Sequence, residues 1–277
     1  MQLQARQEET SASISSSGVA APISTAAIST ATSTGSSSLP TPFDSSLGNN
    51  FTSPSCPNFF RKFLSNDTLT DCLPLSLLLQ TSNSFFKAER SPVLLAQTLD
   101  ASCSANFTSC SASMASLANR IKDDSACGAD LRMENPMVVQ AYTGFLAYDT
   151  LYQAGCLTDG DGNYCFSNAV SNYTAPTSSY IYYLPLGVQL PAGTEPACNA
   201  CLENTMQIFA QAAANDSLPL SDDYSSAAQM IDTACGPSFA IAVATTQQTN
   251  AAASLSAPPW TLGALVLSAL VCGYLVG

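Results

Sequence analysis

The sequence contains no histidine, and this absence narrows the available chemistry more than any other feature. Without histidine the chain cannot build a Ser-His-Asp triad or a Cys-His pair, and it has no imidazole ligand for zinc. It also lacks the side chain that most often serves as a general base near neutral pH. Acid–base chemistry by carboxylates remains open.

Basic residues are scarce as well. The chain has eight Lys and Arg against 20 Asp and Glu, which gives a formal net charge of −12. Binding to nucleic acid or to anionic lipid depends on clustered positive charge. We therefore predict no nucleic-acid partner. No motif in the sequence indicates a cofactor, and we predict none.

The first ten residues (MQLQARQEET) lack the apolar run of a secretory signal peptide. The features described next nevertheless require secretion. We therefore expect either that translation starts elsewhere or that a signal peptide was lost.

The chain is rich in cysteine. Ten of its eleven cysteines lie between residues 56 and 235, a density that is natural in an oxidising compartment and unusual in a reducing cytosol. A block of about 180 residues can bury a core of its own, so disulfides would add to that core and not replace it. We predict that these ten cysteines are all disulfide-bonded: Cys56, Cys72, Cys103, Cys110, Cys127, Cys156, Cys165, Cys198, Cys201 and Cys235.

Five Asn-x-Ser/Thr sequons agree with secretion, although a chain rich in serine, threonine and asparagine produces some by chance. We expect N-glycosylation at Asn50, Asn66, Asn106, Asn172 and Asn215.

Composition divides the chain into four parts. Residues 10–50 hold 19 Ser or Thr in 41 positions, and such a tract cannot bury enough apolar surface to fold. We interpret residues 1–55 as a disordered stalk, either a plain flexible linker or, as we prefer for a secreted protein, an O-glycosylated one. Residues 56–239 form the ten-cysteine ectodomain, 240–259 an uncharged linker that includes the anchor attachment site, and 260–277 an apolar tail.

The cysteine block has the pattern of a single, mainly α-helical domain. Ser91 precedes Pro92 and Asn135 precedes Pro136, and each pair is an N-cap followed by proline at the first helical position. After the second pair, five apolar residues step by three and four along one helical face. These residues are Val138, Ala141, Phe145, Tyr148 and Tyr152.

Residues 180–190 (YIYYLPLGVQL) are the one segment predicted to be extended, as a short hairpin or crossing segment that proline and glycine interrupt. Its tyrosines Tyr180, Tyr182 and Tyr183 could form an aromatic platform for a sugar. Packing into the core is the expected role of at least half of them.

The cysteine spacings repeat. Intervals of 16, 31 and 7 residues after Cys56 are followed by intervals of 17, 29 and 9 after Cys110. We interpret this as three related helical hairpins near 56–103, 110–156 and 198–235, with chance alignment in an Ala/Ser-rich chain as the alternative. The equivalent cysteines of the first two units are Cys56 and Cys110, Cys72 and Cys127, and Cys103 and Cys156. Equivalent cysteines should be bonded equivalently, so a bond from Cys72 to its own hairpin should have a counterpart at Cys127.

Cys198 and Cys201 have the spacing of a redox dithiol. The βαβ setting of a thioredoxin is missing, and a zinc site would need a second such pair or histidines. We therefore interpret them as anchors for disulfides.

Two acidic features have structural interpretations that we prefer. Residues 159–163 (DGDGN) resemble the start of a calcium loop, but the EF-hand glycine and glutamate are replaced by Tyr164 and Val170, so a plain turn is expected. The paired carboxylates at 123–124 and 222–223 could serve a glycosidase. The second pair falls in the first turn of a predicted helix, where acidic residues are favourable. We predict no catalytic, cofactor-binding or metal-binding residue.

The C-terminal tail carries the most specific signal. Residues 260–277 are 18 mainly apolar residues, about 27 Å as a helix, and no charged residue follows Asp232. A transmembrane helix normally carries Lys or Arg on its cytoplasmic flank. Small residues, a short spacer and an apolar end instead indicate a GPI-attachment signal, with Asn250 as the preferred attachment residue and Ala251 or Ser254 as alternatives.

Five short runs resemble a family of secreted, cysteine-rich ascomycete proteins that is known only as a domain of unknown function and whose members often end in GPI signals. The runs are residues 72–76 (CLPLS), 99–103 (LDASC), 183–187 (YLPLG), 198–202 (CNACL) and 235–239 (CGPSF). The resemblance covers about residues 56–239 and implies a fungal cell surface. It supplies no activity, ligand or catalytic residue.

We therefore predict a non-catalytic, GPI-anchored glycoprotein on the extracellular face of the plasma membrane or in the cell wall of a fungus. Its partners would be the membrane, through the anchor, and wall polysaccharide or other surface proteins. The alternative is a carboxylate-dependent enzyme that acts on wall polysaccharide. Acidic residues clustered in a cleft would favour the enzyme, and acidic residues scattered over the surface would favour the non-catalytic protein.

Overall fold

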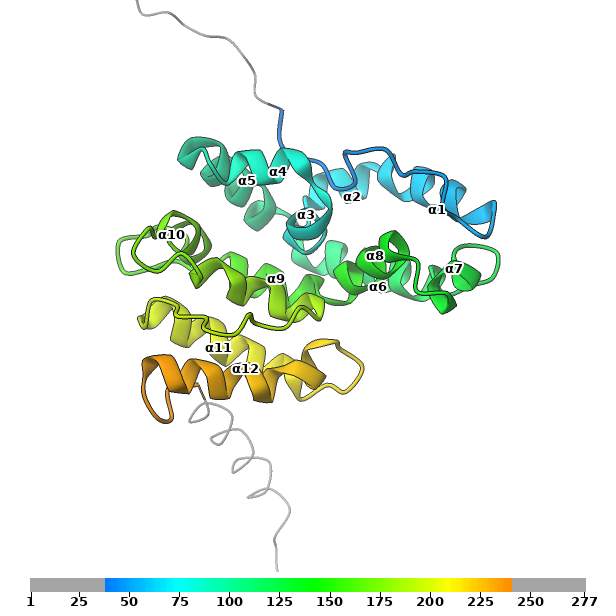
Figure 1. The fold of residues 1–277 in the computed structure, drawn as a ribbon. Coiled ribbons are helices and arrows are strands. Elements are labelled where there is room, and N and C mark those ends of the chain that lie inside the picture. Colours follow the sequence, from blue (N-terminus) through cyan, green and yellow to red (C-terminus); the bar gives the residue numbers. More distant parts are fainter. Residues whose placement is uncertain (1–37, 241–277) are drawn as a thin grey trace, which may run out of the picture. The chain divides into compact units, whose positions relative to one another are not determined.

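A computed structural model describes residues 38–240, and these residues fold into twelve α-helices and one 3-10 helix with no β-strand (Figure 1). In chain order the helices are α1 (Ser55–Leu64), α2 (Asp67–Cys72), α3 (Leu75–Thr81), α4 (Asn83–Ala88), α5 (Pro92–Ser104), α6 (Phe107–Arg120), α7 (Gly128–Arg132), α8 (Pro136–Leu146), α9 (Tyr148–Gly155), α10 (Cys165–Ser171), the 3-10 helix η1 (Ser178–Leu186), α11 (Ala200–Ala213) and α12 (Leu220–Cys235). The predicted mainly helical, disulfide-linked domain is confirmed. None of the helices in this part of the chain is both long and apolar enough to cross a bilayer.

Two helices begin where the sequence predicts them. The Ser91 side chain accepts a hydrogen bond from the Leu94 N–H at the start of α5, and the Asn135 side chain accepts one from the Met137 N–H at the start of α8. Each bond satisfies one of the N–H groups that a helix leaves free at its first turn. The proline that follows each cap has no N–H to satisfy.

The helices enclose two hydrophobic clusters. One is built by α1, α2, α6 and α8 and has Phe60 and Phe63 at its centre, with ring centroids 5.1 Å apart. The other joins α3 to α5 with α9 to α12, and in it Phe166 of α10 contacts the Phe85 ring. Helix α3 belongs to both, because Leu77 lies in the first cluster and Leu78 in the second.

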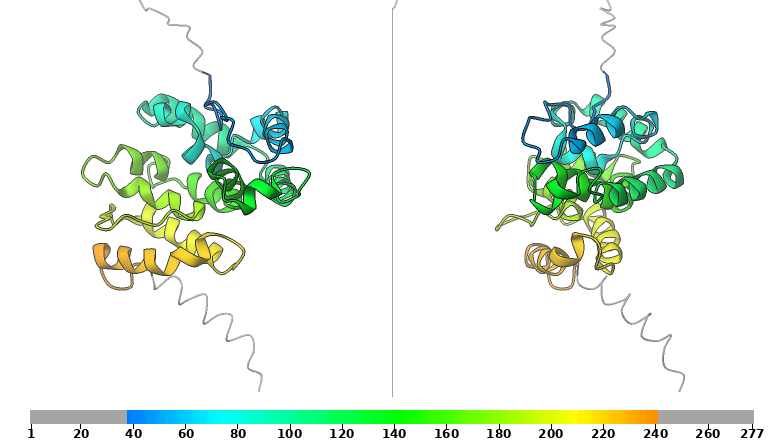
Figure 2. Two further views of the ribbon diagram at one scale, coloured as in Figure 1. Left: turned by 45° about the vertical axis from the view of Figure 1, so that its right-hand side comes forward. Right: turned by 90° about the vertical axis from the view of Figure 1, so that its right-hand side faces the viewer.

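Helices α11 and α12 form an antiparallel hairpin, which lies along the lower edge of the domain in Figure 1 and in both views of Figure 2. Cys198, just before α11, is bonded to Cys235 at the end of α12. This segment is a two-helix hairpin, as the sequence predicts for residues 198–235. The prediction of two-helix hairpins for the other two units is wrong, because residues 56–103 contain five helices and residues 110–156 contain four.

Five disulfides join the ten cysteines of the described chain. They are Cys56–Cys127, Cys72–Cys110, Cys103–Cys156, Cys165–Cys201 and Cys198–Cys235. Neither Cys72 nor Cys127 bonds within its own unit: Cys72 is bonded to Cys110 of the second unit and Cys127 to Cys56 of the first. The reason is spatial: α2 packs against α6, which brings the end of α2 to the first turn of α6.

The folded domain starts at residue 38 and not at residue 56, so the predicted boundary between stalk and domain is wrong. Phe43 is buried in the first cluster, and the Asp44 carboxylate accepts hydrogen bonds from the N–H groups of Asn83 and Ser84. A few apolar and acidic side chains thus fix residues 38–54 to the helices despite a polar composition. Residues 1–37 of the predicted stalk, most of the linker, Asn250 and the apolar tail lie outside the described residues.

The prediction of an extended segment at 180–190 is also wrong. Residues Ser178–Leu186 form the 3-10 helix η1, which ends at Gly187 with φ of 74°. In a 3-10 helix, side chains three residues apart lie above one another. Ile181 and Leu184 are spaced in this way and both are buried, so burial of this face outweighs the strand preference of the tyrosines and isoleucine.

Candidate functional site

The structure does not support a redox role for the Cys198–Cys201 pair. Cys198 is bonded to Cys235 and Cys201 to Cys165, so the two sulfurs do not form one dithiol. Both bonds fix the start of α11, one to α12 and one to α10. The pair acts as two separate anchors.

The acidic loop between α9 and α10 is a turn stabilised by its own side chains. The Asp159 carboxylate accepts hydrogen bonds from the N–H groups of Asp161 and Asn163 and from the Asn168 side-chain amide. These bonds, led by the one from Asn163, lower the pKa of Asp159. Within residues 38–240, no three His, Cys, Asp or Glu side chains group together as a metal site would require.

The paired carboxylates lie apart on the surface. Asp124 forms an exposed ion pair with Arg132 at 2.7 Å. Asp222 and Asp223 lie in the first turn of α12, where the helix dipole favours negative charge, and Asp223 accepts a hydrogen bond from Gln189. Neither pair lines a cavity together with an acid from the other.

The sequons are accessible to different degrees. Asn50, Asn66, Asn106 and Asn215 are exposed, and Asn172 is half-buried. At Asn66 and Asn106 the side-chain oxygen caps a helix by accepting an N–H bond, at 2.9 and 3.0 Å. This leaves the side-chain nitrogen, the atom that a glycan would occupy, pointing away from the cap. Glycosylation at these positions stays a prediction.

The three tyrosines of η1 have different surroundings. Tyr182 is buried, and its hydroxyl lies 3.4 Å from the Thr205 hydroxyl. Tyr180 is 43% exposed. Tyr183 is half-buried, and its hydroxyl donates to the Leu79 carbonyl at 3.3 Å. One of the three is therefore in the core, and the other two reach the surface.

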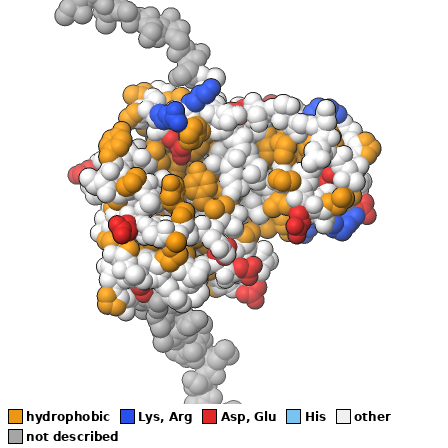
Figure 3. Space-filling view, in the orientation of Figure 1, with side chains coloured by type: hydrophobic (Ala, Val, Ile, Leu, Met, Phe, Trp, Pro, Cys, Tyr) orange, Lys and Arg blue, Asp and Glu red, His pale blue; other side chains and the backbone are white. Residues whose placement is uncertain are grey.

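Tyr180 and Tyr183 line an open groove of about 390 Å³, which we call the aromatic groove. Its walls come from the end of α4, from α10, and from η1 with the segment that follows it. The lining residues are Phe86, Glu89, Val170, Ser179, Tyr180, Tyr183, Val188, Gln189 and Pro191. On the face shown in Figure 3, hydrophobic side chains gather below two basic side chains in the upper left part of the view.

Glu89 is the acidic residue of this groove. Burial raises the pKa of its carboxyl from 4.5 to about 7, and the nearby Arg90 charge opposes this rise. Arg90 does not form an ion pair with it; its guanidinium lies over the Phe86 ring, 4.4 Å from the centroid. No hydrogen bond from the described part of the chain reaches the Glu89 carboxylate, which is therefore half-desolvated and unpaired.

Glu89 and Tyr183 are close enough to affect each other. Burial raises the pKa of Tyr183 to about 12, and the Glu89 carboxylate adds to the rise. The groove thus places an unpaired carboxyl group beside aromatic rings, with no second carboxylate among its lining residues. This arrangement can hold a ligand by stacking and hydrogen bonding, but it lacks the pair of acids on which glycoside hydrolysis depends.

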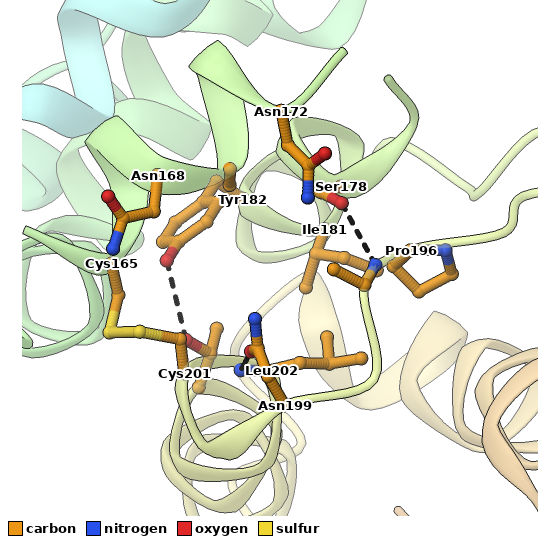
Figure 4. Close-up of a pocket in the computed structure, with 13 residues that line it drawn as sticks. Cys165, Asn168, Asn172, Ser178, Ile181, Tyr182, Pro196, Asn199, Cys201 and Leu202 are labelled. Atoms are coloured by element: carbon orange, nitrogen blue, oxygen red, sulfur yellow. Dashed lines mark hydrogen bonds between the residues drawn. A yellow bond between two sulfur atoms is a disulfide. The ribbon is translucent and has the colours of Figure 1, made fainter. Parts of the chain in front are cut away.

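A second cavity, shown in Figure 4, is too small to be a ligand site. It lies between α10, η1 and the start of α11, and the Cys165–Cys201 disulfide is part of its wall. Its volume of about 50 Å³ has room for a few water molecules only. Its polar side chains bond to neighbouring protein groups, as Ser178 does to the Ala197 N–H.

Sequence reasoning identified Tyr180 and Tyr183 of this groove and missed Phe86, Glu89 and Val188. No signal in the sequence separates Phe86 from Phe85, since the adjacent Phe59 and Phe60 of α1 are both buried. Phe85 is buried and Phe86 is 56% exposed. Nothing in the sequence places Glu89 beside residues almost 100 positions later.

Comparison with known protein families gives one match. The family model described as Domain of unknown function (DUF7729) matches residues 38–245, which includes the whole described domain and its first ordered segment. Neither the curated proteins nor the solved structures that were searched contain a match to this chain.

Proposed function

The chain belongs to the DUF7729 family, whose description names no activity, and we propose from its own features that it is a GPI-anchored glycoprotein of the fungal cell surface that acts by binding and not by catalysis. Five disulfides in one domain indicate an oxidising, extracellular environment. The anchor is inferred from the uncharged apolar end of the sequence, and the fungal source from the family resemblance.

The observation that carries the non-catalytic role is the composition of the aromatic groove. Its lining offers aromatic rings and one carboxyl group, Glu89. The acids at 123–124 and 222–223 do not line it, although Asp223 accepts a hydrogen bond from the lining residue Gln189. An enzyme that cleaves polysaccharide through carboxylates needs two of them on opposite sides of the bond it breaks. The groove therefore favours binding over the alternative of a wall-degrading enzyme.

The test is to treat membranes and walls of the native host with phosphatidylinositol-specific phospholipase C and with glucanase. Release by the lipase, with a mature C-terminal peptide that ends near Asn250, is the expected result. A C-terminal peptide that contains Trp260 would contradict the anchor.

The enzymatic alternative has its own measurement. Purified protein incubated with β-glucan should release no reducing sugar above a buffer control. Sustained release that is lost in Glu89→Gln would contradict the non-catalytic role.

A further inference from the structure

The aromatic groove carries an inference about the ligand that rests on the proposed binding role. We propose that it binds a segment of neutral, β-linked polysaccharide of gluco configuration, which stacks on Phe86 and Tyr180 and forms hydrogen bonds with Glu89 and Gln189. Such chains are a class of ligand that a surface-anchored domain would meet outside the cell.

The first argument is the exposure of the rings. Phe86 and Tyr180 expose 56% and 43% of their surfaces, although both are large apolar side chains. They come from segments far apart in the sequence, yet they line the same groove. Exposed aromatic residues that gather at one place mark a binding site more often than a chance feature of the surface.

The second argument is the set of free polar groups around these rings. The Glu89 carboxylate and the hydroxyls of Ser179 and Tyr180 take part in no hydrogen bond with the described chain. Gln189 donates its side-chain N–H to Asp223 at 2.8 Å, which fixes the amide and leaves its oxygen free to accept. Polar groups at the edge of an apolar bed match a ligand that has an apolar face and a polar rim.

A pyranose in gluco configuration has this distribution of groups. Its hydroxyls are equatorial, so its C–H bonds point to the two faces of the ring, and these faces can stack on aromatic rings. The hydroxyls lie at the edge, within reach of the carboxylate and amide oxygens. An axial hydroxyl, as in mannose, would place a polar group against the rings.

The charge of the groove supports a neutral ligand. Glu89 and Arg90 have opposite charges, and the whole chain carries a formal charge of −12. A polyanionic polysaccharide would therefore be repelled. A lipid chain is also a poor occupant, because the groove is open to solvent and its edge is polar.

The experiment is a titration of the full-length, disulfide-intact protein with laminarihexaose and with cellohexaose. Calorimetry or NMR detects the binding, and mannohexaose is the comparison sugar. Saturable binding of at least one glucan, and much weaker binding of mannohexaose, is the expected result. No saturable binding of either glucan at millimolar concentration overturns the proposal, as does equal binding of all three sugars.

Variants locate the site. Tyr180→Ala should weaken binding about five- to tenfold, because it removes an exposed stacking surface, whereas Tyr180→Phe should retain most of it. Tyr173→Ala is the matched control, because Tyr173 is 95% exposed, lies outside the groove and can be replaced without loss of the Asn172 sequon. Equal binding by Tyr180→Ala and wild type overturns the location.

The outcomes separate this inference from the proposed function. If phospholipase releases the protein but no glucan binds, the proposed anchor stands and the proposed ligand is wrong. If glucan binds but the lipase does not release the protein, the proposed ligand stands and the proposed anchor is wrong.

Discussion

Cys103 and Cys156 occupy equivalent places in the two copies of the cysteine repeat, and they are bonded to each other with Cα atoms 5.6 Å apart. The other bonds between the copies are the crosswise pairs Cys56–Cys127 and Cys72–Cys110. An exchange of the two copies maps this set of three bonds onto itself. Equivalent cysteines are therefore bonded equivalently, as a duplication predicts, but between the copies and not within them.

The Cys103–Cys156 bond should contribute strongly to stability. It closes a loop with a sequence separation of 53 residues, for which the chain-entropy model gives about 4 kcal/mol. We expect the double variant Cys103→Ser/Cys156→Ser, which leaves no free thiol at this site, to lower the free energy of unfolding by about 2–4 kcal/mol in denaturant titration. A loss below about 1 kcal/mol would show that packing alone holds α5 to α9.

Asp130 should be the main attachment of residues 52–53. Its carboxylate is fully buried and accepts hydrogen bonds from the N–H groups of Thr52 and Ser53, at 2.6 and 3.1 Å. In Asp130→Asn one acceptor oxygen becomes a donor that faces another donor, which should cost about 2–3 kcal/mol in the free energy of unfolding. Hydrogen exchange at residues 50–54 should increase at the same time.

The matched control for this prediction is Asp124→Asn. Asp124 takes part in an exposed ion pair, and such pairs contribute about 0–1 kcal/mol. Equal losses of stability in the two variants would contradict the role given to Asp130.

Gly144 should be required for the contact between α3 and α8. A Cβ atom at this position would overlap Leu77 Cδ2 and would lie 3.1 Å from the Ser76 carbonyl oxygen, which belongs to the backbone and cannot rotate away. We expect Gly144→Ala to lower the free energy of unfolding by about 1–3 kcal/mol through overpacking.

Gly160→Ala serves as the control for this substitution, because nothing lies within 4 Å of the added atom. Its thermal unfolding should remain close to that of the wild type. Stabilisation of the protein by Gly144→Ala would show that the contact between α3 and α8 has room for an added methyl group.

The raised pKa of Glu89 predicts a dependence of stability on pH. The folded protein holds this proton up to about pH 7, whereas the unfolded chain releases it near the ordinary value of 4.5. The protonated carboxyl therefore contributes fully to the free energy of unfolding below pH 4.5, and this contribution is lost as the pH rises to 7. In wild type, unfolding free energy should fall by about 1–2 kcal/mol over this range, less than the whole shift implies because the carboxyl is partly solvated.

Glu89→Gln is neutral at every pH and should lack this decline. Denaturant titrations of both proteins at intervals between pH 4.5 and 7.5 make the comparison. Parallel curves for the two proteins would contradict the burial of Glu89.

Local features of the sequence predicted much of the helical structure. Ser91 and Asn135 cap the helices that they were expected to cap, because a cap depends only on residues within one turn. The extended segment predicted at 180–190 is wrong, because the β preference of its residues is weak compared with the burial that tertiary packing offers to Ile181 and Leu184.

Contacts between segments that are distant in the sequence could not be predicted from local sequence patterns. Ten cysteines allow 945 pairings, and the choice among them depends on which helices pack together. The groove shows the same limit: Tyr180 was identified from its own segment, whereas Phe86 and Glu89 reach it only through the packing of α4 near η1. The sequence also gave no sign that Asp44 and Asp130 would hold residues 38–54 to the domain.

The five disulfides make this chain an oxidised domain whose first two units are bonded crosswise. The most direct test is peptide mapping of the native protein after alkylation under denaturing, non-reducing conditions. We expect no labelled thiol between residues 56 and 235, together with linked peptides for Cys56–Cys127, Cys72–Cys110 and Cys103–Cys156. Free thiols at Cys198 and Cys201, or a bond between Cys72 and Cys56, would contradict it.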